Sequence, residues 1–110
     1  MNTLRNKVQL IGNLGNDPEI INLESGKTLA KFSIATNESY KNAQGEKVTD
    51  TQWHNIVAWG KTAQIVEKYI TKGKEVVVEG KLTSRSWEDK DGNKRYITEV
   101  VVSELLMLSK

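Results

Sequence analysis

The sequence predicts an all-β fold with one helix, and three observations lead to this prediction. Apolar and polar residues alternate along five long segments, as they do in half-buried strands. Turn-forming residues separate these segments, and only one stretch has the residue spacing of an amphipathic helix. Three strands, a helix and two more strands within 110 residues is the order of the OB-fold, a five-stranded Greek-key barrel with its helix between strands 3 and 4.

The N-terminal half supplies three long strands and one short one. In chain order they are Leu4 to Leu14, the short Glu19 to Leu23, Thr28 to Ser39, and Asp50 to Trp59. Turn-forming residues 15–18 follow the first strand, and a polar loop over residues 42–49 precedes the last. On the strand that starts at Thr28, alternation turns Phe32 and Ile34 toward the core and Lys31 toward solvent.

The C-terminal half begins with the helix, which is predicted over Lys61 to Lys72. Its apolar face is expected to consist of Ala63, Ile65, Val66, Tyr69 and Ile70. Gly73 is the expected C-terminal stop. The last two strands, Glu75 to Trp87 and Lys94 to Leu108, are joined by turn-forming residues 89–93 and should form a hairpin.

Length and composition set broad bounds. A chain of 110 residues predicts a single domain over residues 1–110. The net charge of +2, from 16 basic and 14 acidic residues, is too small to indicate nucleic acid by itself. Charges interrupt every apolar stretch, and residues 1–5 lack the apolar segment of a signal peptide. We therefore expect a cytoplasmic protein without a membrane partner.

Trp87 is the most informative residue. If Glu75 to Trp87 is a strand, alternation puts Trp87 on the same face as Arg85 and Lys81. A large aromatic ring on a charged, solvated face is unfavourable unless something covers it. An unpaired nucleic-acid strand suits this surface, because its bases stack on rings and its phosphates meet cations.

Two further tryptophans belong to the strand Asp50 to Trp59. Alternation puts Trp53 and Trp59 on one face and His54 on the other, which looks like core or subunit interface. In the alternative arrangement both indoles fill the barrel and His54 points outward. Two indoles would crowd a small barrel, so we expect them outside, on the face that OB-folds use for binding.

Other aromatic and basic residues extend this candidate surface. Tyr40 ends the second long strand and is a stacking candidate, although strict alternation would turn it inward. Tyr96 is expected to take part in cross-strand packing. The cations expected to contact phosphates are Lys61, Lys72, Lys81 and Arg85.

The sequence offers little for catalysis. His54 is the only histidine and there is no cysteine, so no zinc-binding spacing exists. Asp89 and Asp91 precede Gly92 but lack the later glutamate of a calcium loop. We therefore predict no enzymatic activity, no bound metal and no cofactor.

Seven short motifs occur in order and cover nearly the whole chain. They are NKVQLIGNLGNDPE (6–19), ATNESY (35–40), TQWHNIV (51–57), WGK (59–61), YITKG (69–73), VEGKL (78–82) and YITEV (96–100). In order and spacing they closely resemble bacterial single-stranded DNA-binding proteins. The resemblance implies an OB-fold that assembles as a homotetramer and binds single-stranded DNA without sequence preference.

The resemblance also assigns roles to particular residues. The base-stacking aromatics of the family correspond to Tyr40, Trp53, Trp59 and Trp87. His54 matches a histidine at a subunit interface, and Asn55 stands where many relatives carry a basic residue. Relatives commonly continue into a flexible linker and an acidic tip that recruits replication and repair proteins. This sequence ends at residues 108–110 without one, so it is either a DNA-binding core cut from a longer protein or a naturally short relative. Replication and repair proteins are possible partners, but docking through such a tail cannot be carried over to this sequence.

We therefore predict a cytoplasmic, nucleoid-associated protein that binds and protects single-stranded DNA during replication, recombination and repair. One alternative is a primosome-type OB accessory protein, which would bind single-stranded DNA and protein partners as a dimer. Another is an RNA or tRNA binder on the same fold. The number of subunits distinguishes the dimeric accessory protein from a tetramer. Competition between matched DNA and RNA oligomers distinguishes an RNA binder from a DNA binder.

Overall fold

The computed structural model describes residues 3–108. Its elements in chain order are a 3-10 turn (Thr3–Asn6), β1 (Val8–Leu14), β2 (Glu19–Asn22), β3 (Thr28–Lys41), β4 (Lys47–Trp59), α1 (Gly60–Tyr69), β5 (Glu75–Glu88) and β6 (Lys94–Met107). The described range excludes Met1 and Asn2, at the start where no signal peptide is predicted. It also excludes Ser109 and Lys110, where a tail would begin.

Five of the six strands close into a barrel. The strand order is β1-β5-β6-β4-β3-β2, and a further pairing of β1 with β3 closes the ring. That closing pair aligns Asn13 with Ala35 and Leu14 with Ile34. β4 and β6 pair in parallel, whereas the other pairs are antiparallel. The prediction of an OB-fold is confirmed, with one small correction. Because β2 is a strand in its own right, the helix lies between β4 and β5 rather than between strands 3 and 4.

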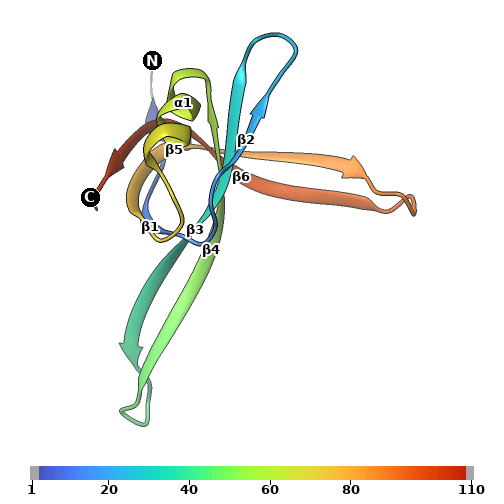
Figure 1. Cartoon of the computed structure of the whole chain (residues 1–110). Coiled ribbons are helices and arrows are strands. Elements are labelled where there is room, and N and C mark those ends of the chain that lie inside the picture. Colours follow the sequence, from blue (N-terminus) through green and yellow to red (C-terminus); the bar gives the residue numbers. More distant parts are fainter. Residues whose placement is uncertain (1–2, 109–110) are drawn as a thin grey trace.

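The core lies inside the barrel and beneath the helix. The largest fully buried side chains are Ile34, Ile56, Val66, Ile70, Val76 and Val78. Figure 1 shows α1 seated beside the barrel strands, and Ala63 and Val66 of α1 are buried. Ile65 and Tyr69, which were expected to widen the apolar face, are exposed instead. The helix is only ten residues long, and Ala63 and Val66 are its buried residues, so its apolar face is narrower than predicted.

Two long hairpins project from the barrel as arms. Figure 1 shows the β3–β4 and β5–β6 hairpins extending in different directions beyond the barrel strands. Residues 37–41 of β3 and 84–88 of β5 are all exposed. Leu82 lies on the same face of the strand as the buried Val76 and Val78, yet it is exposed because β5 has already left the barrel there. In these arms alternation no longer separates a buried face from a solvated one.

Three predicted boundaries were wrong, each for a local reason. Residues 3–6 form a 3-10 turn rather than strand. The side-chain amide of Asn6 accepts a hydrogen bond from the backbone N–H of Leu82 and donates one to its C=O. The loop after β3 is shorter than predicted, because Asn42 accepts hydrogen bonds from two backbone N–H groups and closes a tight turn. α1 ends at Tyr69, so Lys72 lies outside the helix.

Within residues 3–108, α1 is the one α-helix, and no helix there has both the length and the apolarity to cross a membrane.

Candidate nucleic-acid interface

Four aromatic rings predicted to lie outside the barrel are exposed. The exposed fractions are 55% for Tyr40, 61% for Trp53, 43% for Trp59 and 44% for Trp87. The alternative arrangement, with the indoles inside, is wrong because Phe32, Ile34 and Ile56 already fill that space. On β4 the opposite face carries Ile56 and Ala58, both buried, as alternation predicted.

Two adjoining hollows form a groove on the outside of the barrel. The first has a volume of about 280 Å³ and is lined by Asn16, Glu19, Lys31, Phe32, Ser33, Asn55, Ile56, Arg85, Ile97 and Glu99. The second has a volume of about 310 Å³ and is lined by Leu29, Lys31, Val57, Trp59, Thr83, Arg85, Glu99 and Val101. Because both include Lys31, Arg85 and Glu99, we treat them as one central groove.

The rings are distributed around this central groove rather than gathered at one point. Trp59 lines it directly. Trp53 lies against Gly15, the neighbour of Asn16 at the other end of the groove. Trp87 lies near the groove residue Arg85, whose Cζ is 5.4 Å from its ring centroid. Tyr40 lies farther out on the β3–β4 arm. It is therefore exposed, although strand alternation puts it on the same face as the buried Phe32 and Ile34.

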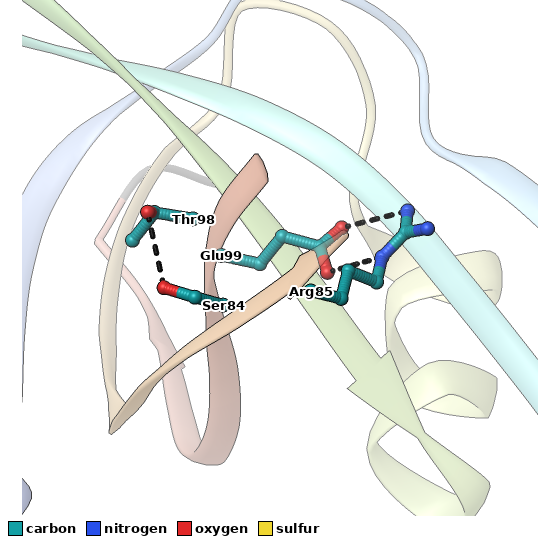
Figure 2. A network of polar contacts seen from close by, with 4 residues as sticks. All are labelled: Ser84, Arg85, Thr98 and Glu99. Atoms are coloured by element: carbon teal, nitrogen blue, oxygen red, sulfur yellow. Dashed lines mark hydrogen bonds and ion pairs between the residues drawn. The ribbon is translucent and has the colours of Figure 1, made fainter. Parts of the chain in front are cut away.

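Arg85 is held in place by a carboxylate at the floor of the groove. Figure 2 shows the Arg85 guanidinium directed at Glu99, with Nε 3.0 Å from Oε1 and Nη2 3.5 Å from Oε2. The hydroxyls of Ser84 and Thr98, 3.3 Å apart, form a separate pair on the same hairpin. Glu99 is only 7% exposed. Arg85 is therefore an ion-paired cation held between a carboxylate and the Trp87 ring, not a free one.

Sequence reasoning missed Glu99 and undervalued Lys31. Glu99 lies on β6 opposite Thr83, two residues along β5 from Arg85. Opposite charges at such diagonal positions of a hairpin are a recognisable pairing signal. Lys31 was expected to point outward, and it lines both hollows of the central groove.

The three predicted lysine contacts are exposed but line neither hollow of the groove. Lys61 is in the first turn of α1. Lys72 follows the helix, and its backbone N–H donates to the Asp17 carboxylate at 2.8 Å. Lys81 lies on β5 in another hollow, beside Arg5 and Lys7. Their role in phosphate contact remains a prediction.

The tip of the β5–β6 arm is ordered by its own polar contacts. The Asp89 carboxylate accepts hydrogen bonds from the backbone N–H groups of Asp91 and Asn93 and pairs with Arg95 at 2.9 Å. The Asn93 N–H, followed by the Arg95 side chain, lowers the pKa of Asp89 below its usual value. Tyr96 is exposed rather than packed across the strands, and the Lys94 Nζ lies 5.6 Å from its ring centroid.

His54 is half-buried in the β3–β4 sheet, with Nε2 3.1 Å from the Thr36 hydroxyl. Its assignment to a subunit interface remains a prediction. Across the described residues 3–108, no three His, Cys, Asp or Glu side chains gather closely enough to hold a metal ion.

Comparisons with known proteins agree with this geometry. The profile of the "Single-strand binding protein family" matches residues 5–108. "Single-stranded DNA-binding protein 1" of Chlorobaculum tepidum is 49% identical over 104 residues, which cover 94% of this chain and 64% of that protein. Its namesake in Xylella fastidiosa is 46% identical over 106 residues, covering 96% of this chain and 78% of that protein.

A solved structure titled "Plasmodium falciparum SSB complex with ssDNA" is also similar, with a TM-score of 0.86 and 37% sequence identity. The match covers 94% of this chain and 95% of that one. This chain spans just under two thirds of the length of the Chlorobaculum protein.

Proposed function

The chain belongs to the single-strand binding protein family, and from this premise we propose that it binds single-stranded DNA without sequence preference. The observation that carries the proposal is the set of exposed rings around one groove that also holds Lys31 and Arg85. Every base has a flat face that can stack, so a surface of this kind does not discriminate strongly between sequences.

In this proposal the rings and the cations have separate tasks. Tyr40, Trp53, Trp59 and Trp87 stack on unpaired bases, at about 1–3 kcal/mol for each stacked base. Lys61, Lys72, Lys81 and Arg85 contact phosphates and release counterions from the strand. The protein keeps exposed strands extended and protected during replication, recombination and repair, and it catalyses no reaction.

The test is a titration with oligothymidylate, followed by tryptophan emission at several salt concentrations. We expect strong quenching as bases cover the indoles. We also expect the logarithm of affinity to fall with the logarithm of salt concentration by roughly 0.7 for each phosphate contacted. Unchanged emission at saturating oligomer would exclude Trp53, Trp59 and Trp87 as contacts. Binding that does not respond to salt would exclude the cations.

We propose that the chain acts as a homotetramer, and an exposed apolar row supports assembly. Ile11, Val77 and Leu106 are cross-strand neighbours on β1, β5 and β6, and the outer two are exposed. Apolar surface of this kind usually marks an interaction site. His54 would lie at a second contact between subunits. Light scattering that gives four subunits supports the tetramer, whereas two subunits would favour the primosome-type accessory protein.

The cellular setting follows from the proposed ligand. Single-stranded DNA is exposed at the nucleoid, so we propose that the protein works there, in the cytoplasm. Contacts with replication and repair proteins would have to use the folded part described here or a segment beyond it.

A further inference from the structure

Gly15, in the loop between β1 and β2, lies directly under the indole of Trp53. A Cβ atom at Gly15 would be 2.3 Å from Cζ3 and 2.6 Å from Cη2 of Trp53. Real Cβ atoms essentially never approach other atoms so closely. The six-membered ring of the indole therefore occupies the space that any side chain at position 15 would need.

The glycine is not required there by its backbone conformation. The positive-φ glycines of the described chain are Gly26, Gly45, Gly60, Gly73 and Gly92, and Gly15 is not among them. An alanine could adopt the Gly15 backbone without strain. Room for the Trp53 ring is thus the structural reason for a glycine at this position.

The loop that carries Gly15 is tied to the barrel on both sides. The Gly15 N–H donates to the Ser33 carbonyl at 3.1 Å, and the Leu14 N–H donates to the Lys74 carbonyl at 3.0 Å. The Asn16 side chain accepts hydrogen bonds from the Ser33 hydroxyl at 2.9 Å and from the Ser33 backbone N–H at 3.3 Å. A side chain at position 15 would therefore displace the ring rather than the loop.

The ring is free to be displaced, because Trp53 is 61% exposed on the outer face of β4. Its atoms nearest Gly15 are at the far end of the side chain, where a change in side-chain torsion moves them most. Moving the indole away from Gly15 would leave the buried core unchanged. It would change the direction in which the ring faces a base.

We propose that Gly15 is a positioning residue for Trp53. Its bare backbone lets the indole lie back against the β1–β2 loop, so that one face is supported and the other is presented to a base. The proposal rests on the proposed function in one respect, that Trp53 contacts single-stranded DNA. It adds that the β1–β2 loop sets the geometry of that contact.

The experiment compares Gly15→Ala, Trp53→Ala and the double variant in oligothymidylate binding. We expect Gly15→Ala to weaken binding about tenfold, which is within the range for losing one stacked base. In the Trp53→Ala background the added methyl group meets no ring, so Gly15→Ala should then have no further effect. This non-additivity is the signature of a residue that acts through its neighbour.

A matched control is Gly26→Ala, which adds the same methyl group where no atom lies within 4 Å. Because φ of Gly26 is +86°, this variant should lose some stability yet bind oligothymidylate as the wild type does. It separates a general loss of stability from displacement of Trp53. Near-ultraviolet circular dichroism of the free protein should change in Gly15→Ala and not in Gly26→Ala.

The outcomes separate the two proposals. If the wild type fails to bind, the proposed function fails, but an altered indole spectrum in Gly15→Ala still supports the positioning role. The positioning role is overturned if Gly15→Ala binds like the wild type. It is also overturned if Gly15→Ala weakens binding as much in the Trp53→Ala background as in the wild type. If Gly15→Ala does not fold, recovery of folding in the double variant supports the steric contact, and no recovery refutes it.

Discussion

A variant with alanine at Trp53, Trp59 and Trp87 is expected to bind oligothymidylate at least about a hundredfold more weakly than the wild type. Each stacked base contributes about 1–3 kcal/mol, so three rings correspond to about 3–9 kcal/mol if their effects add. Neighbouring contacts on one strand are rarely additive, so we take the lower part of this range. Since no tryptophan remains, binding is measured by the fluorescence anisotropy of a labelled oligomer.

The same variant should keep its fold, because all three side chains are exposed and contribute little to the core. Circular dichroism and a thermal melt check this point. Tyr69→Ala is the matched control, since it removes an exposed ring from α1, away from the central groove. A triple variant that binds within about twofold of the wild type would show that stacking on these rings does not drive binding.

The largest effect on stability is expected from Gly80→Ala. A Cβ atom at Gly80 would lie 2.0 Å from the carbonyl oxygen of Val101 and 3.0 Å from the Cα of Val102. These are backbone atoms of β6, which is paired to β5 around a bulge between Glu79 and Gly80. Backbone atoms of a paired strand cannot move out of the way by a change of rotamer, as a side chain can. We expect a loss of about 3 kcal/mol or more, at the upper end for overpacking.

For a domain of about 100 residues this loss corresponds to a fall in Tm of roughly 12–24 °C. Urea denaturation gives the change in the free energy of unfolding directly. Ser84→Ala, on the exposed part of the same strand, should melt within a few degrees of the wild type. If Gly80→Ala has an unchanged Tm, β5 and β6 separate more easily than their backbone hydrogen bonds imply.

Most of the barrel core could be predicted from the sequence because burial there follows strand alternation, although Leu29 and Val57 are buried on the outward face. Along β3, Phe32 and Ile34 are buried and Lys31 is half-buried, as their parity predicts. The arms could not be predicted in the same way. Tyr40 has inward parity and Leu82 shares the parity of Val78, yet both are exposed because the barrel does not extend to them. Alternation reports which face a residue is on, and not whether anything covers that face.

In the candidate site, too, some features could be predicted from single strands and others could not. The outward faces of Trp53 and Trp59 follow from parity within β4, and both are exposed. Trp87 is exposed for a different reason, because both faces of its arm are uncovered. The pairing of Arg85 with Glu99 depends on the register between β5 and β6, which no single strand contains. The groove around Lys31 likewise depends on five strands, because residues of β2, β3, β4, β5 and β6 line it. Features that need two or more elements in register were the ones the sequence left open.

The ion pair between Arg85 and Glu99 has a consequence for the kinetics of binding. A cation and an anion 3.0 Å apart look almost neutral to a polyanion that approaches from a distance, so this pair does little to speed encounter. Lysines on the surrounding surface would then set the association rate. The groove, with its rings and its fixed guanidinium, would set how long a bound strand stays. Arrival and residence would thus be governed by different residues of the same small barrel.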